Sequence, residues 1–288
     1  MKLPEQWREL DFEKILICTG NYSNKFEMMN QLLDLGVEKS FIGFIEEYQR
    51  YYDIDRIEVV DKNTVLVYSE NTVVCCENPI EYMIAHEIFA KGDYGLHATG
   101  KRFVIDVGMN IGCATLYFAA KEYVTDVYGF EPCKKVYDKA LSNIKRNEKD
   151  IREKIHTYNI ALGGKNSMER YITHSGERES AGIMKVPAGM KSDADTIVEI
   201  ETVQTSCILK DIFSNHEEKC ILKMDCEGAE YDILGDLCNT DEIEKVDIII
   251  MEWHVGKYRE LEGLLEKAGF HYLLQKGERD FGKCYAWR

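Results

Sequence analysis

The chain of 288 residues is 45% hydrophobic and 30% charged, and its formal net charge is −15. Such a composition is ordinary for a globular protein with room for one large or two modest domains. The negative charge argues against nucleic acid as a partner, because phosphates attract a basic surface. No apolar run approaches the ~18 residues of a membrane helix, and the N-terminus lacks the apolar core of a signal peptide. We therefore expect no membrane span and a cytoplasmic location.

The ten cysteines are scattered along the chain, and no CxxC pair occurs. Three of them, Cys75, Cys76 and Cys220, fall within predicted strands. Disulfide frameworks are typical of small extracellular domains, whereas thiols stay reduced in the cytoplasm. The sequence thus predicts free, mostly structural cysteines.

Residues 1–55 are predicted to form a strand–helix–strand extension. The apolar run at 14–20 ends in glycine, Gly36 stops the helical pattern at 25–35, and a second strand follows. The loop after the first strand, CTGNYSNK, has no glycine-rich turn that could receive a cofactor. We expect this extension to contribute packing or the contacts of a homo-oligomer.

Residues 56–100 are predicted to form a β-hairpin and a cap helix. Apolar residues alternate from Ile57 to Cys76, with breaks at DKN and SEN that suit tight turns. Pro79 is placed to begin the helix, and Gly92 is placed to end it.

The stretch 103–132 carries the most specific signal in the sequence. An apolar run ends in Asp106, a helical pattern covers 111–123, and a second apolar run ends in Glu131. The separation of the two acids, 131 − 106 = 25 residues, is about what a strand–helix–strand unit requires. An acid at the end of the second strand can accept hydrogen bonds from both hydroxyls of a ribose. The stretch therefore predicts a site for a nucleoside cofactor.

The turn within this stretch favours S-adenosylmethionine (SAM) over NAD. Dinucleotide sites use G-x-G-x-x-G, whose glycines serve a pyrophosphate. Here Asn110 stands between Gly108 and Gly112 where that pattern needs a glycine, and Asp106 would repel a pyrophosphate. A tight turn without a ligand remains an alternative, as does an NAD-linked enzyme of the same fold.

The rest of the chain alternates strands and helices, as a doubly wound sheet requires. The strands are predicted at 103–107, 126–130, 155–160, 220–225, 246–251, 270–275 and 283–287. The helices are predicted at 111–123, 133–147, 228–238 and 257–268. A polar, glycine-rich insert at 163–209 interrupts this order, and loops of this length are usually functional or mobile. We expect the insert to be a flap over the acceptor, with a tip that has no function as the alternative.

Four motifs, DVGMNIG, GFEP, NIALGG and KMDCEGAEYDIL, resemble in this order those of the FkbM family of SAM-dependent methyltransferases. The resemblance covers roughly residues 80–288. It implies an α/β fold in residues 101–288, namely the Rossmann-like doubly wound seven-stranded sheet of a class I methyltransferase. The segment 1–55 is similar to the last part of a small Rossmann-like domain, either incomplete or added as a layer. One departure is Met109, where the family usually has a small residue.

The resemblance implies SAM as the cofactor and O-methyl transfer to sugars or other hydroxylated compounds. The cofactor-binding residues that we expect on the predicted turn and strand ends are Asp106, Gly108, Asn110, Gly112, Glu131, Asn159 and Ala161.

Acidic and imidazole side chains follow two central strands of the predicted sheet. Asp225 ends ILKMD, while Glu252 and His254 lie at the end of DIIIMEWH. Ligands bind beyond the carboxyl ends of the strands in an open α/β sheet, and methyl transfer to a hydroxyl benefits from a base. We therefore predict Asp225 and His254 as catalytic residues, with Glu227 beside them.

Alternatives stay open for these side chains. Glu230 falls in the first turn of a helix, where an acid also stabilises the helix dipole. His254 could instead be a partly buried histidine whose hydrogen bonds to its neighbours serve only the structure. Together with Glu252, the three predicted catalytic residues also offer ligands for a divalent metal. No spacing requires a metal, and we predict none.

The predicted function is SAM-dependent O-methyl transfer to a hydroxyl of a small-molecule acceptor, a saccharide or a glycosylated metabolite. The alternatives are an NAD-linked Rossmann oxidoreductase and a catalytically inactive SAM-fold protein that serves binding or assembly. The sequence leaves the identity of the acceptor and the oligomeric state open.

Overall fold

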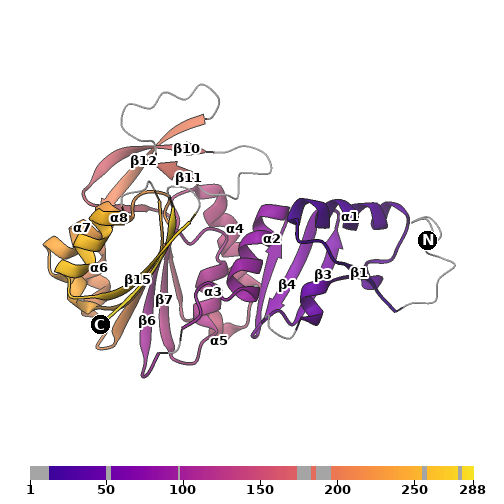
Figure 1. Cartoon of the computed structure of the whole chain (residues 1–288), viewed down its shortest axis with the longest axis horizontal. Coiled ribbons are helices and arrows are strands. Elements are labelled where there is room, and N and C mark those ends of the chain that lie inside the picture. The colour runs from indigo at the N-terminus through magenta and orange to yellow at the C-terminus, as the bar shows by residue number, and fades with distance from the viewer. Residues whose placement is uncertain are drawn as a thin grey trace. The chain divides into compact units, whose positions relative to one another are not determined.

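The computed structural model describes residues 13–49, 53–96, 98–173, 183–185, 196–254, 258–277 and 281–288. The chain divides into two compact units, Met1–Gly95 with Asn143–Glu148 and Leu96–Ser142 with Lys149–Arg288. Figure 1 labels the helices and strands of both units.

The first unit begins with the predicted strand, helix and second strand. Its elements here are β1 (Ile15–Ile17), α1 (Tyr22–Asp34), η2 (Lys39–Phe41), β2 (Ile42–Phe44) and η3 (Ile45–Tyr48). Strands β1 and β2 pair in parallel, as the ends of a strand–helix–strand unit do. The side chain of Asn21 caps α1, because its oxygen accepts a hydrogen bond from the backbone N–H of Asn24.

A three-stranded antiparallel meander follows, one strand more than the predicted β-hairpin. Its strands are β3 (Arg56–Asp61), β4 (Thr64–Ser69) and β5 (Thr72–Cys76). Asn63 and Asn71 adopt positive φ angles of 65° and 67° at its two turns, a conformation that asparagine tolerates well. Helix α2 (Pro79–Ala85) then begins at the predicted proline and continues as a π-helical turn, η4 (His86–Ala90).

The second unit is built on the predicted seven-stranded sheet, in the order β15–β16–β14–β13–β6–β7–β8. Its strands are β6 (Arg102–Val107), β7 (Val124–Phe130), β8 (Ile155–Tyr158), β13 (Lys219–Met224), β14 (Val246–Trp253), β15 (His271–Lys276) and β16 (Gly282–Trp287). Strands β8, β7, β6, β13 and β14 are parallel, and β16 is antiparallel to both of its neighbours. The strand order reverses between β6 and β13, which is where open α/β sheets bind ligands.

Helices cover both faces of this sheet. They are α3 (Cys113–Ala119), α4 (Lys134–Lys145), α5 (Lys149–Arg152), α6 (Thr205–Ser214), α7 (Glu230–Asn239), η6 (Glu242–Lys245) and α8 (Tyr258–Lys267). Helix α3 lies on one side of the sheet, and α6, α7 and α8 lie on the other (Figure 1). Buried side chains of β6, β13 and β14 form the centre of the apolar core with those of α6 and α7. None of the ten cysteines, all of which lie in the described part of the chain, forms a disulfide bond, as the sequence predicted. In the described part of the chain, no helix has the length and apolarity needed to cross a membrane.

The helices differ from the prediction in two places. The helix predicted at 111–123 is shorter at both ends and spans Cys113–Ala119, and its late start follows from the positive φ angles of 52° and 91° at Asn110 and Gly112, which extend the preceding turn. Helix α6 was not predicted, since its first half lies within the insert at 163–209.

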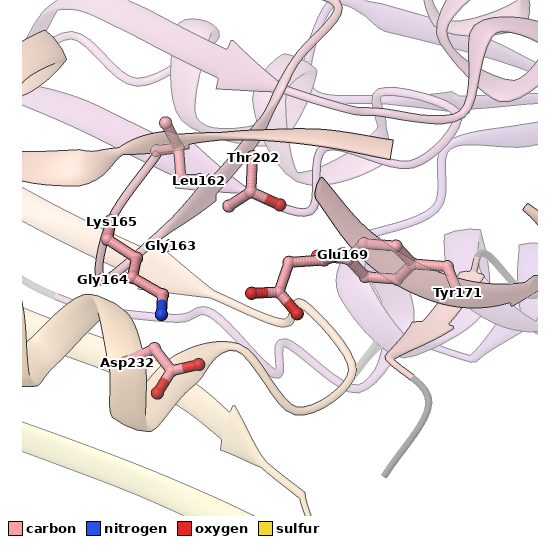
Figure 2. A pocket seen from close by; sticks show the side chains of 8 residues that line it. All are labelled: Leu162, Gly163, Gly164, Lys165, Glu169, Tyr171, Thr202 and Asp232. Atoms are coloured by element: carbon pink, nitrogen blue, oxygen red, sulfur yellow. The ribbon is translucent and has the colours of Figure 1, made fainter. Parts of the chain in front are cut away.

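The insert forms a second sheet of four strands, in the order β11–β10–β12–β9. The strands are β9 (Ala161–Gly163), β10 (Ser167–Thr173), β11 (Ile183–Lys185) and β12 (Thr196–Gln204). Residues 174–182 and 186–195 of the predicted insert lie outside the described residues. Part of this sheet and helix α7 line a cavity (Figure 2).

Candidate active site

The turn between β6 and α3 is shaped by Gly108, which no other residue could replace without a backbone shift. Its φ is 79°, and a Cβ atom there would lie 1.8 Å from the carbonyl oxygen of Asp225. Asn110 and Gly112 also have positive φ angles. The backbone directly after β6 therefore touches the backbone at the end of β13. Such a turn lets a ligand approach the backbone closely.

Met109 fills a space that a glycine leaves on the next strand. Its side chain is buried, and a Cβ atom at Gly129 would lie 2.5 Å from its sulfur. The methionine at this position therefore packs directly against the backbone of β7.

Glu131 lies directly after β7 and faces the turn. One carboxylate oxygen accepts a hydrogen bond from the backbone N–H of Asn110 at 3.0 Å, and the other accepts one from that of Cys133 at 2.8 Å. Burial raises the pKa of Glu131 to about 7, although these two hydrogen bonds act in the opposite direction. Each oxygen keeps a further lone pair for a hydroxyl donor. Glu131 thus has the chemistry to bind a ribose next to the turn.

Asp106 is fully buried and forms an ion pair with Lys223 on the neighbouring strand at 2.8 Å. It also accepts a hydrogen bond from the hydroxyl of Thr115. The ammonium group of Lys223 also donates a hydrogen bond to the carbonyl oxygen of Gly108 at 2.7 Å. The ion pair therefore stabilises the turn that follows β6. Burial disfavours the charge of Lys223, but Asp106 outweighs it and the pKa of the lysine is raised. A direct contact between Asp106 and a ligand stays a prediction.

The other two predicted cofactor residues lie near the end of β8. The amide nitrogen of Asn159 donates to the carbonyl oxygens of Glu131 and Pro132 at 2.8 and 3.1 Å. Asn159 therefore holds the segment that carries Glu131. Ala161 is buried at the start of β9 and pairs with Thr202 in the second sheet, so it offers only backbone and a methyl group. Its contact with a cofactor stays a prediction.

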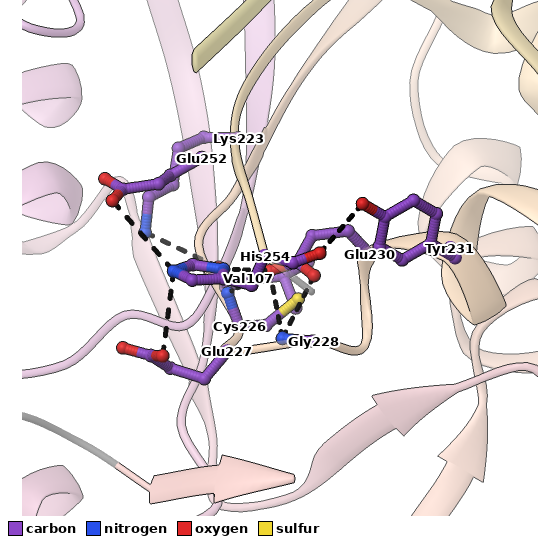
Figure 3. Close-up of polar contacts among 9 residues, drawn as sticks. All are labelled: Val107, Lys223, Cys226, Glu227, Gly228, Glu230, Tyr231, Glu252 and His254. Atoms are coloured by element: carbon purple, nitrogen blue, oxygen red, sulfur yellow. Dashed lines mark hydrogen bonds and ion pairs between the residues drawn. The ribbon is translucent and has the colours of Figure 1, made fainter. Parts of the chain in front are cut away.

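The three predicted catalytic residues come together beyond the ends of β13 and β14. Figure 3 shows two of them, Glu227 and His254, with their neighbours. One ligand atom each of Asp225, Glu227 and His254 lies within 4.8 Å of the others. The Nε2 atom of His254 lies 3.6 Å from a carboxylate oxygen of Glu227 and 3.9 Å from one of Glu252. Glu227 has a positive φ of 55°, followed by Gly228 at 109°, and this sharp turn brings its side chain back toward the histidine.

Glu230 holds this histidine in place, a role that the sequence did not predict. Its side chain is fully buried, and the Nδ1 atom of His254 lies 2.9 Å from its Oε1 atom. Backbone N–H groups of Cys226 and Gly228 donate to the same carboxylate. Because a carboxylate only accepts, Nδ1 carries a proton and Nε2 is the nitrogen that faces Glu227.

The charges of this cluster favour the protonated histidine. Burial alone would lower the pKa of His254, but the hydrogen bond and charge of Glu230, followed by Glu227 and Asp225, raise it to about 9. Burial raises the pKa of Glu227 to about 7, and the charge of His254 acts against that rise. At neutral pH the cluster therefore holds a charged imidazole beside a carboxyl group that is close to its own midpoint.

The same atoms could offer a divalent cation two carboxylates and one imidazole. A histidine with a pKa of about 9 keeps a proton on Nε2 at neutral pH, so the proton competes with a metal for that atom. We retain the prediction that no metal takes part.

The strand order, the turn after β6 and the acid after β7 together define a class I methyltransferase with a Rossmann-like fold. The chain matches the methyltransferase FkbM domain over residues 106–272 and belongs to that family.

Individual relatives are distant. Methyltransferase sdnD of Sordaria araneosa is 25% identical over 220 residues, which are 68% of this chain and 84% of sdnD. The AMB antimetabolite synthetase AmbE of Pseudomonas aeruginosa is 25% identical over 296 residues, which are 88% of this chain and 13% of AmbE. The crystal structure of methyltransferase FkbM from Methylobacillus flagellatus aligns with a TM-score of 0.45 and 14% identity, covering 67% of this chain and 45% of that one. The chain thus spans a small part of AmbE and less than half of the FkbM structure.

Proposed function

We propose that the second unit binds SAM and transfers its methyl group to a hydroxyl of a saccharide or a glycosylated metabolite. The observation that carries this proposal is the hydrogen bond from the backbone N–H of Asn110 to Glu131. It joins the acid expected to bind the ribose hydroxyls to the glycine-containing turn. The missing Cβ at Gly108 and the free lone pairs of Glu131 fit a nucleoside at this edge. SAM supplies a methyl group that its sulfonium already activates, so the protein needs alignment and a proton acceptor.

The proton acceptor lies among Asp225, Glu227 and His254. Glu227 suits the task at neutral pH, because a general base works best when its pKa is near the operating pH, and its own is about 7. His254 holds and orients this carboxyl through Nε2 and becomes a base itself as the pH approaches 9. Asp225 offers a further carboxylate to the same hydroxyl.

Calorimetric titration tests the cofactor half of the proposal. We expect SAM and S-adenosylhomocysteine to bind and NAD not to bind. Glu131→Ala should weaken SAM binding by roughly 1–3 kcal/mol, the scale of hydrogen bonds to a charged acceptor. Asp126→Ala is the matched control, because Asp126 belongs to the same strand and pairs with His156 at 2.9 Å instead of facing the turn. The proposal is contradicted if NAD binds, or if Glu131→Ala leaves the affinity for SAM unchanged.

A further inference from the structure

The cavity beside the second sheet is lined by groups that the methyl-transfer site does not use. It has a volume of about 240 Å³ and lies between β9, β10, β12 and the first turn of α7. Figure 2 shows its polar lining, which consists of Lys165, Glu169, Tyr171, Thr202 and Asp232. Sites that enclose drug-sized ligands have ~300–1,000 Å³. This cavity therefore suits one ring with its substituents.

Thr202 gives the clearest sign of a ligand. Its residue is only 3% exposed, and within the described residues its hydroxyl oxygen has no hydrogen-bond partner. Buried hydroxyls nearly always have a partner, because leaving one unpaired is unfavourable. The hydroxyl points to the side of the cavity on which Glu169 lies (Figure 2). A group bound in the cavity would supply the missing partner.

Close packing fixes the position of this hydroxyl. A Cβ atom at Gly163 would lie 2.5 Å from the methyl carbon of Thr202, so the methyl group rests against the glycine. A Cβ atom at Gly164 would lie 3.1 Å from the backbone oxygen of Asp232, so the same segment also touches α7. The two glycines thus bring β12 and α7 close enough to form one cavity.

The charges of the lining select the class of ligand. Lys165 donates hydrogen bonds, Glu169 and Asp232 accept them, and a hydroxyl such as that of Thr202 does both. The charged groups sum to +1 − 2 = −1, which disfavours phosphate and other anions. A sugar ring carries several hydroxyls that donate to carboxylates and accept from an ammonium group. We propose that this cavity binds a neutral, hydroxyl-rich ring, a non-reacting sugar unit of the acceptor.

This proposal rests on the proposed function and deepens it. Helix α7 contributes Asp232 to the cavity and Glu230, two residues earlier, to the histidine cluster. Residues two apart in a helix point about 200° apart. The cavity and the cluster therefore flank the first turn of α7. A ring bound in the cavity would hold the acceptor while another of its hydroxyls reaches the cluster, which is how remote contacts aid catalysis.

Thr202→Val separates a binding role from a structural one. Valine has the shape of threonine without the hydroxyl, so removal of an unpaired buried hydroxyl should not lower the melting temperature. Thr72→Val is the matched control, because Thr72 is equally buried and donates to the carbonyl oxygen of Ser69 at 2.6 Å. That control should melt about 2–4 °C lower.

The binding experiment uses protein-observed NMR with methyl glycosides of glucose, galactose, mannose and N-acetylglucosamine, and with inorganic phosphate. We expect at least one glycoside to bind, and Thr202→Val to weaken it roughly fivefold, the factor of one neutral hydrogen bond. Glu169→Gln should weaken it as well, while SAM affinity stays unchanged in both variants.

The proposal is overturned if no glycoside binds, if phosphate binds in their place, or if Thr202→Val melts as low as the control with glycoside binding unaltered. SAM titration keeps the two proposals apart. Glycoside binding without SAM binding would defeat only the proposed cofactor, and SAM binding without glycoside binding would defeat only the cavity.

Discussion

Two histidines of this chain lie beside buried glutamates, yet their pKa values are shifted in opposite directions. In the first unit, Nε2 of His86 lies 3.7 Å from Glu46, and Nδ1 lies 3.1 Å from the hydroxyl of Tyr22. Burial lowers the pKa of His86 despite this glutamate. In the second unit, the pKa of His254 is raised to about 9 beside Glu230.

Two differences separate the pairs. Burial acts against protonation of both histidines, but Glu230 accepts a hydrogen bond from His254 at 2.9 Å, whereas Glu46 lies 3.7 Å from His86. Lys25 is buried 2.7 Å from Glu46 and balances its charge, and Lys91 and Lys25 both oppose protonation of His86. The carboxylates Glu230, Glu227 and Asp225 all favour protonation of His254. A glutamate beside a histidine therefore does not by itself define a proton-transfer site, because the hydrogen bond and the sum of charges around the pair decide.

Removal of each imidazole should have the largest effect, and on different properties. His254→Ala should slow methyl transfer by up to about 10²–10⁴, the usual loss of a general base, because Glu227 loses the imidazole that orients it, while SAM affinity stays unchanged. His86→Ala should leave transfer unchanged and lower the melting temperature. Single-turnover transfer of labelled methyl, with SAM titration alongside, measures both. If His86→Ala slowed transfer as much as His254→Ala, the contrast between the two sites would be lost.

Breaking the ion pair between Lys25 and Glu46 in the first unit should have the second-largest effect. Glu46→Gln leaves the ammonium group of Lys25 buried without its counter-charge, which typically costs about 3–5 kcal/mol of unfolding free energy. Asp34→Asn is the control, since Asp34 pairs with Lys62 on the surface and both side chains are more than half exposed. Denaturant unfolding monitors both variants. Equal stability of Glu46→Gln and the control would mean that Glu46 does not neutralise Lys25.

The smallest effect concerns the titration of the two histidines. Glu230→Gln should lower the pKa of His254 by roughly 1–2 units, because it removes the hydrogen bond to a charged acceptor. A histidine with a raised pKa contributes stability that is fully present below its ordinary 6.5 and is lost as the pH rises through about 9. The variant should therefore lose much of that pH dependence. NMR titration of the imidazole signals checks this, and a native His254 that titrates at or below 6.5 contradicts the charge comparison.

Much of the sheet could be predicted because its strands are apolar runs. The strand that contains Asp106 differs from the predicted one by one residue at one end, and the strand before Asp225 differs by one residue at each end. The turn at Asn110–Gly112 was harder, because left-handed backbone at a non-glycine residue has no reliable pattern in sequence. The second sheet was missed because its strands sit in a polar segment whose pairing is non-local.

The site could be predicted wherever strand ends bring residues together. Asp225, Glu227 and His254 follow neighbouring parallel strands, so their meeting follows from the topology. The contacts of Glu230 and Lys223 could not be predicted from the order of the strands alone. Glu230 reaches His254 only because the turn at Glu227 and Gly228 has left-handed backbone. Lys223 had a signal that was overlooked, since a lysine within the apolar run ILKM requires a buried partner. Strand register makes Asp106 that partner.

The contact between Met109 and Gly129 constrains how this chain could have changed over time. A Cβ atom at 129 would lie 2.5 Å from the sulfur of Met109, so a side chain at 129 requires the methionine to move. The same Cβ atom would lie 3.2 Å from the hydroxyl oxygen of Thr115, which is also a tight contact. A substitution at 129 is therefore easier once position 109 carries a smaller residue, and methionine at 109 is best accommodated beside glycine at 129. Changes at the two positions are thus expected to depend on one another.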